Sequence, residues 1–148
     1  MKLSKKSRYG LRALIDLAVH TKTHPVTLSS IAERNGISLQ YLEQVFAGLR
    51  RAGIIKSIKG PQGGYLLARE AAQITAADIL EALEGDYLAA DEEMPEDNSY
   101  ARSSVVVQEL IIDRVNAELE MLLKDISLSE LEQSFLSRQE YGENMYYI

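Results

Sequence analysis

Two short helical patterns separated by only three residues constrain the fold of this chain most. Residues 28–35 and 39–52 both show the spacing of a helix with one buried face. In the second pattern the apolar face consists of Leu42, Val45, Phe46 and Leu49. Gly36 can adopt the left-handed conformation that ends a helix, and Ser38 is a favourable N-cap for the next one. Because the connection is so short, the helices are predicted to cross steeply, as in a helix-turn-helix.

The segments on either side complete a small domain. A first helix is expected over residues 8–20, where apolar residues recur on one face. Residues 54–58 and 65–68 indicate two short strands, joined by the glycine-rich turn of residues 59–64. A hairpin directly after a helix-turn-helix is a wing. A fourth helix over residues 76–84 is predicted from a capping box formed by Thr75 and Asp78.

The second half of the chain contains the longest periodic segment, residues 103–124, which carries a wide apolar stripe. So long a stripe needs a covering surface, and a second copy of the chain is the simplest one. The residues assigned to this dimer contact are Val107, Leu110, Ile111, Val115, Leu119 and Leu122. A capping box of Ser127 and Glu130 predicts a last short helix, ending near residue 137.

The expected fold is therefore mainly α with a small β-hairpin wing: a winged helix-turn-helix followed by a long dimerisation helix. Its predicted parts are a DNA-binding domain (1–85), an acidic loop (86–102), dimerisation helices (103–137) and a C-terminal tail (138–148). The loop is expected to be mobile because charged residues dominate it.

The charge distribution is strongly asymmetric. Residues 1–69 hold twelve Lys and Arg against three Asp and Glu, a net charge of +9. Residues 70–148 hold four against nineteen, a net charge of −15, so the total of −6 conceals a basic half. A basic half of this kind creates a local field that attracts phosphate, and this favours a nucleic-acid partner.

The second helix of the helix-turn-helix is the predicted reading element, because side chains near the start of such a helix reach base edges in the major groove. Glutamine can pair with adenine, and a carboxylate can accept a hydrogen bond from cytosine N4. The candidate base-reading residues are Ser38, Gln40, Tyr41, Glu43 and Gln44.

A second set of residues is expected to contact the phosphates, which fixes the register of the protein but carries no sequence information. It combines basic side chains, the N-terminus of the helix at residues 28–35, and the wing. The members are Lys2, Lys5, Lys6, Arg8, Thr27, Ser29, Arg50, Arg51, Lys56, Lys59, Gly60 and Gln62.

Four segments also carry a family resemblance: residues 9–14 (YGLRAL), 36–44 (GISLQYLEQ), 57–65 (SIKGPQGGY) and 79–85 (ILEALEG). Together they resemble the winged-helix regulators typified by the bacterial iron–sulfur cluster regulator, the nitric-oxide-sensing repressor and the cysteine-metabolism repressor. The resemblance is strong over about residues 1–85 and only topological beyond. It implies a homodimer that binds pseudo-palindromic operators through this helix and the wing.

Resemblance to the cluster-binding members of that family would imply three cysteines in the loop before the long helix. This chain departs from those members. None of the 148 residues is a cysteine, which excludes a thiolate-bound cluster. The acidic loop could attract a hard cation, but it lacks the spacing of an EF-hand, so a solvated loop is favoured. No metal, cofactor or catalytic residue is predicted. With no signal peptide or apolar span in the sequence, a bacterial cytoplasmic protein is expected.

The end of the sequence, Met145-Tyr146-Tyr147-Ile148, resembles the tail of the cysteine-metabolism repressor subgroup. In that subgroup the effector is a protein, cysteine synthase, which also accepts the C-terminal isoleucine of another enzyme. Tyr146, Tyr147 and Ile148 are therefore candidate partner-binding residues, with the isoleucine in an apolar pocket. The alternative is that these residues pack on the protein or on its dimer mate.

These observations predict a homodimeric, sequence-specific DNA-binding regulator. We expect a repressor without an iron–sulfur cluster that controls cysteine or sulfur metabolism through a protein co-effector. The alternative is a winged-helix adaptor for other proteins with little affinity for DNA. The charge distribution separates the two, because an adaptor has no need of so basic a half.

Overall fold

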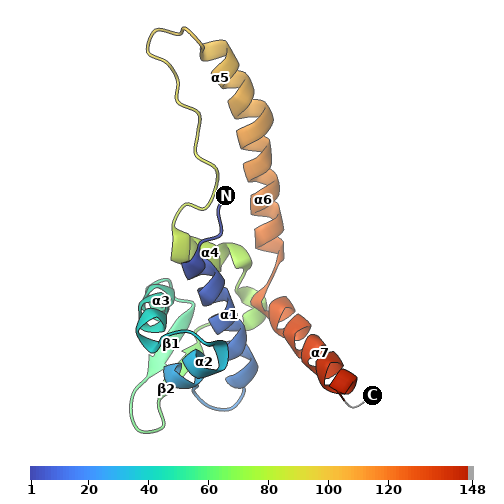
Figure 1. Ribbon diagram of the computed structural model, residues 1–148. Helices are drawn as coiled ribbons and strands as arrows, with labels where there is room; N and C mark the ends of the chain where they lie inside the picture. Colours follow the sequence, from blue (N-terminus) through green and yellow to red (C-terminus); the bar gives the residue numbers. More distant parts are fainter. Residues whose placement is uncertain (147–148) are drawn as a thin grey trace.

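The structure is a computed structural model that describes the backbone of residues 1–146 and the side chains of residues 1–139. Its elements, in chain order, are α1 (Lys5–His20), α2 (Leu28–Asn35), α3 (Leu39–Arg51), β1 (Ile55–Ile58), β2 (Gly64–Leu67), a 3-10 turn η1 (Ala71–Gln73), α4 (Ala76–Glu84), α5 (Ala101–Val107), a π-helical segment η2 (Gln108–Ile112), α6 (Asp113–Asp125) and α7 (Leu128–Tyr146). The first four helices and the hairpin form a compact head, from which α5–α6 rises as one long rod (Figure 1).

The predicted winged helix-turn-helix is confirmed. Gly36 ends α2 in the left-handed conformation (φ 63°), and the Ser38 hydroxyl caps α3 by accepting a hydrogen bond from the backbone N–H of Tyr41 at 3.1 Å. The capping box of Thr75 and Asp78 is also present at the start of α4. Both predicted helices, α2 and α4, have the bounds expected from the sequence.

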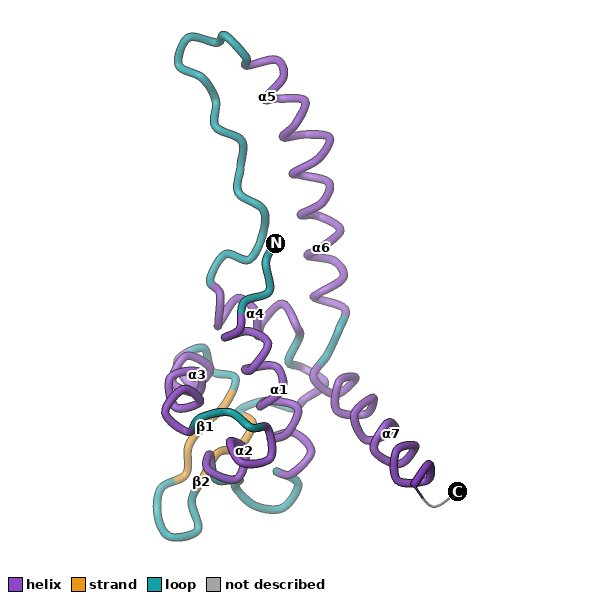
Figure 2. The backbone as a smooth tube through the Cα atoms, viewed as in Figure 1, coloured by secondary structure: helices purple, strands orange, loops and turns teal. Residues whose placement is uncertain are grey.

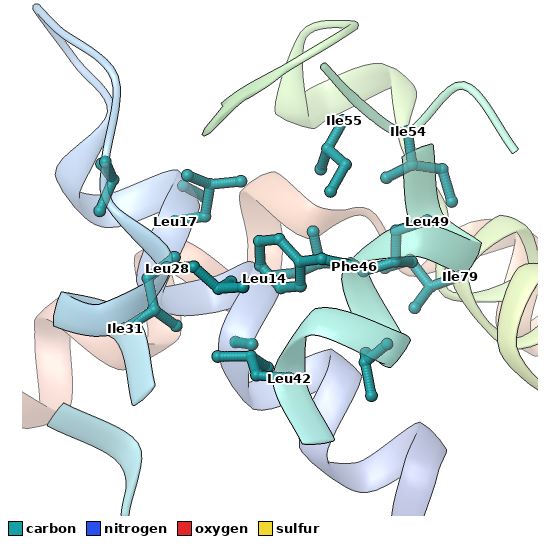
Figure 3. Packing of buried hydrophobic residues seen from close by; sticks show 14 of the residues in the cluster. Leu14, Leu17, Leu28, Ile31, Leu42, Phe46, Leu49, Ile54, Ile55 and Ile79 are labelled. Carbon is teal, nitrogen blue, oxygen red and sulfur yellow. The ribbon is translucent and has the colours of Figure 1, made fainter. Parts of the chain in front are cut away.

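One hydrophobic core holds the head together (Figure 3). Leu42, Phe46 and Leu49 of α3 have no exposed surface. They pack in one cluster with Leu14 and Ile31, which come from α1 and α2. Burial of each large apolar side chain stabilises the fold by about 1.5–3 kcal/mol. The inner face of α3 is therefore fixed against the other two helices.

The wing is an antiparallel hairpin in which Ile55 pairs with Leu67 and Ile58 with Gly64. Its second strand also pairs with the segment before α2, because Val26 and Tyr65 exchange two backbone hydrogen bonds of 3.0 and 2.7 Å. A Cβ atom at Gly64 would lie 2.5 Å from the carbonyl oxygen of Val26, so only glycine fits there. The base of the wing is thus tied to the start of α2.

The long helix runs without a break from α5 through η2 to α6 (Figure 2). The preceding loop has no regular structure, as predicted, but it is fastened to this helix. Asn116 exchanges two hydrogen bonds with the backbone of Ala89, at 2.9 and 3.0 Å. Gln108, the first residue of η2, accepts a hydrogen bond from the N–H of Glu92 and donates to Asp91 and Asp113. The side chains of Asn116 and Gln108 thereby tie the loop to the long helix.

The last helix is longer than predicted. The capping box of Ser127 and Glu130 starts α7 as expected, but the helix continues past residue 137 to Tyr146. The prediction of a helix ending near residue 137 and a separate tail over residues 138–148 was therefore wrong. Tyr147 and Ile148 lie outside the described residues, as does the side chain of Tyr146. None of the helices described is both long and apolar enough to cross a membrane.

The N-terminus of α1 is held by an acidic residue of α4. The carboxylate of Glu84 accepts hydrogen bonds from the Ser4 hydroxyl, from the Ser4 backbone N–H at 3.2 Å and from the Ser7 hydroxyl at 2.5 Å. These bonds favour the charged form and lower the pKa of Glu84 below its ordinary value of 4.5. The negative charge also lies at the favourable end of the α1 dipole.

We expect Glu84→Ala to lower the free energy of unfolding by about 1–3 kcal/mol at pH 7, because it leaves charge-assisted hydrogen bonds unmade. Since the pKa of Glu84 is lowered by folding, this contribution is present above pH 4.5 and disappears as the pH falls through the folded value. Urea unfolding of both proteins across this range measures it. Glu81→Ala, at an exposed position of the same helix, is the control, and an equal cost for the two variants at pH 7 would contradict the assignment.

Candidate nucleic-acid interface

The outer face of α3 is polar and open to solvent. Gln40, Glu43 and Gln44 are exposed, and they follow one another at helical spacing opposite the buried face. Ser38 is exposed as well, although its hydroxyl oxygen already serves as the N-cap. The structure therefore places four of the five predicted base-reading residues on one accessible surface. Whether they read bases stays a prediction.

Tyr41, the fifth predicted base-reading residue, lies differently. It is half-buried and packs edge-on against Tyr9 of α1, with ring centroids 5.6 Å apart. Such a pair adds about 0.5–1.5 kcal/mol beyond the area that it buries. Tyr41 thus helps to fix the start of α3 on α1, a role that its helical position alone did not indicate.

Two basic side chains flank this aromatic pair. The Lys5 ammonium lies 5.3 Å from the centre of the Tyr9 ring, and the Arg12 guanidinium lies 5.5 Å from it. Arg12 also donates a hydrogen bond of 2.5 Å to the carbonyl oxygen of Asn35, the last residue of α2. Positive charge is therefore held beside the turn and the start of α3. Arg12 was missed as a phosphate-contacting candidate, although its spacing from Lys5 and Arg8 along α1 (i, i+3, i+7) would have revealed it.

A buried carboxylate positions the turn of the helix-turn-helix. Asp16 of α1 accepts two hydrogen bonds from Arg34, at 2.7 and 2.9 Å, and one from the Asn35 side chain at 3.1 Å. The hydrogen bonds to Asp16 raise the pKa of Arg34 above its ordinary value, so the guanidinium remains charged. The bidentate pair clamps the end of α2 onto α1 and commits Arg34 to a structural role.

The predicted phosphate-contacting residues lie in two places. Arg50, Arg51, Lys56, Lys59, Gly60 and Gln62 are exposed at the end of α3 and on the wing. Thr27 and Ser29 are exposed at the start of α2, next to the base of the wing. Lys2, Lys5 and Arg8 are exposed and Lys6 is half-buried, all near the start of α1. That end of the chain lies beside α4, away from the turn of the hairpin (Figure 2), so the structure does not bring Lys2 close to the wing.

The residues predicted to form the dimer contact give the long helix an exposed apolar surface. Leu110, Ile111, Val115 and Leu122 are at least half exposed, and Val107 and Leu119 are half-buried. Several of them line a shallow groove of about 660 Å³, together with Arg114 and Glu118. A surface of this kind is costly to leave in water. Met121, which is 70% exposed, belongs to the same helix but was not predicted as part of the contact.

Taken together, the geometry defines a winged helix-turn-helix head with a basic, polar surface along α3 and the wing. Residues 3–134 match the Rrf2 family, described as iron-dependent transcriptional regulators. The chain belongs to the Rrf2 family. Its proteins are transcriptional regulators rather than enzymes.

Individual relatives agree with this membership. The chain is 48% identical over 84 residues to the HTH-type transcriptional regulator IscR of Xenorhabdus nematophila; these residues are 57% of this chain and 51% of that protein. It thus spans about half the length of the curated relatives that it matches. Among solved structures, the global cysteine regulator CymR of B. subtilis is 40% identical with a TM-score of 0.75, covering 90% of this chain and 98% of that one. The T. potens IscR structure is also 40% identical, with a TM-score of 0.69 and coverage of 90% and 88%.

We expect Gln44→Ala to weaken binding to a selected duplex by about 1–3 kcal/mol and to relax sequence preference at one base-pair position. The reason is that Gln44 is exposed on the outer face of α3, where a side-chain amide can pair with a base edge. Fluorescence anisotropy on the selected duplex and on single-position variants measures both effects. Gln73→Ala, exposed but on η1, is the matched control. Equal loss on every duplex would remove Gln44 from base reading.

Proposed function

We propose that this protein is a homodimeric, sequence-specific DNA-binding transcriptional regulator that acts as a repressor. The observation that carries the proposal is the outer face of α3, where Gln40, Glu43 and Gln44 stand exposed on a helix whose inner face is fully buried. A helix held in this way can enter a major groove without rearrangement, and this reduces the cost of binding.

The charge around α3 supports the same function. Lys5 and Arg12 lie against the ring of Tyr9, beside the start of α3. Arg50 and Arg51 lie at the end of α3, and Lys56 lies on the neighbouring strand. Phosphates run along both sides of a groove, so basic groups on both ends of the reading helix suit that geometry. An adaptor for other proteins would not need this arrangement, and it is the less favoured alternative.

The dimer rests on the exposed apolar face of the long helix. Leu110 is 59% exposed and Leu122 is 57% exposed, three turns further along the same helix. A second copy related by a twofold axis would cover both residues, because the same surface then serves each partner. Such a dimer presents two α3 helices, which suits an operator with two inverted half-sites.

The regulated process and the co-effector form a narrower part of this proposal. Control of cysteine metabolism is supported by the similarity to the B. subtilis protein, whose structure is titled the global cysteine regulator. The proposed partner, cysteine synthase, would bind the Tyr146-Tyr147-Ile148 tail, which lies at and beyond the end of the described residues. Capture of cysteine synthase by the full chain, and its loss when Tyr147 and Ile148 are deleted, would support this part. Unchanged capture by the shortened chain would overturn it.

We expect binding to a selected duplex to be strongly salt-dependent. If six phosphate contacts form in each protomer, the slope of log K against log salt is on the order of −8 to −11. Random duplexes should show the same electrostatic dependence at much lower affinity. Fluorescence anisotropy between about 50 and 200 mM salt, the range over which such slopes are resolved, measures the slope. The regulator assignment is wrong if no duplex is preferred and no salt dependence appears.

A further inference from the structure

A cavity of about 390 Å³ opens between α1, the end of α2 and α7. This volume falls in the range of small-molecule sites in proteins. One wall is apolar: it is formed by Ile15 and Val19 of α1 and by Phe135 of α7. Phe135 is 43% exposed, so part of this apolar wall is open to solvent.

The remaining lining is polar and carries excess positive charge. Arg12 and Arg34 supply this charge against one carboxylate, that of Asp16, and His20, Asn35 and Gln139 complete the polar lining. Arg34 and the Asn35 amide already satisfy Asp16 with three hydrogen bonds. Arg12 donates only to the neutral carbonyl oxygen of Asn35, and no carboxylate of residues 1–139 lies within ion-pair distance of it. Arg12 therefore lines the cavity beside an apolar wall, and its guanidinium has no carboxylate partner among residues 1–139.

We propose that this cavity binds a small organic carboxylate with a short apolar body, and that its occupancy weakens DNA binding. The carboxylate pairs with the Arg12 guanidinium, which can donate two parallel hydrogen bonds to it. The apolar body lies against Val19 and Phe135. An inorganic anion would leave that wall uncovered, and a neutral ligand would not form an ion pair with Arg12.

The coupling to DNA rests on the proposed function and follows from the other contacts of Arg12. Its guanidinium holds the carbonyl of Asn35, one residue before the turn, and lies over Tyr9, which packs against Tyr41 of α3. A ligand that draws Arg12 into the cavity removes both contacts from the start of α3. This movement also takes the positive charge of Arg12 away from the edge of the exposed α3 surface. Ligand and DNA therefore oppose each other, by the same factor in both directions.

The binding step is tested by isothermal titration calorimetry of the full chain with 4-methylpentanoate, which has a carboxylate and a branched apolar body. We expect saturable binding with Kd on the order of millimolar or tighter, because a ligand of eight heavy atoms can reach this affinity. The isosteric 4-methylpentanamide, which has no charge, should bind at least about tenfold more weakly. Equal binding of acid and amide, or no saturable binding of the acid, overturns the site.

Variants of α7 locate the binding. Phe135→Ala should weaken 4-methylpentanoate about tenfold, because it removes most of one apolar wall. Leu136→Ala is the matched control, since Leu136 is similarly exposed (37%) on the same helix but does not line the cavity. An unchanged affinity in Phe135→Ala, or an equal loss in both variants, contradicts the assignment. Circular dichroism of each variant verifies that the fold is retained.

The coupling is measured separately, as the affinity for a selected duplex with and without saturating 4-methylpentanoate. We expect a loss of about fivefold or more, which is the usual scale of coupling between sites. An unchanged duplex affinity in the wild type overturns the coupling. If the protein prefers no duplex at all, the proposed function fails, whereas calorimetry still decides whether the cavity binds the carboxylate.

Discussion

The burial of one face of α3 is the constraint on which the rest of the interface depends. Phe46 and Leu42 are fully buried in the core of the head, so α3 cannot rotate without exposing them, at a cost of about 1.5–3 kcal/mol for each side chain. The outer residues have no freedom to turn inward. The same packing that stabilises the head therefore aims Gln40 and Gln44 at solvent, and stability and recognition come from opposite faces of one helix.

Polar contacts set the remaining details of this arrangement. The Asp16–Arg34 pair fixes the end of α2, and the Tyr9–Tyr41 pair fixes the start of α3, so the turn between them is held from both sides. Glu84 performs a comparable task at the start of α1, where it holds the segment that carries Lys5 and Arg8. The acidic half of the chain thus supports the basic half directly. The proposed carboxylate cavity lies next to the first of these contacts, where a small ligand can reach Arg12.

Much of the fold could be predicted from the sequence because its signals are local. Caps such as Thr75 with Asp78 and the glycine after α2 act within a few residues, and the bounds of α2 and α4 were predicted correctly for that reason. The π-helical segment was not predicted; it begins at Gln108, whose side chain accepts a hydrogen bond from the loop. The end of the last helix was predicted near residue 137, whereas α7 continues to Tyr146.

The candidate site was predictable to a similar degree. Exposure of Gln40 and Gln44 follows from helical periodicity, but the partners of Tyr41 and Arg12 do not, because Tyr9 and Asn35 are distant in sequence. Likewise, a sequence without cysteine indicates which iron ligands are missing, but it does not reveal a cavity formed by α1 and α7.

Selection of duplexes from a random pool by the full-length chain tests the central claim most directly, because it requires both the reading helix and the dimer. The account predicts enrichment of an inverted repeat whose half-sites are centred about 10–10.5 base pairs apart, or a multiple of that spacing. A pool without any enriched sequence after repeated rounds would contradict it, as would enrichment of a single unrepeated half-site.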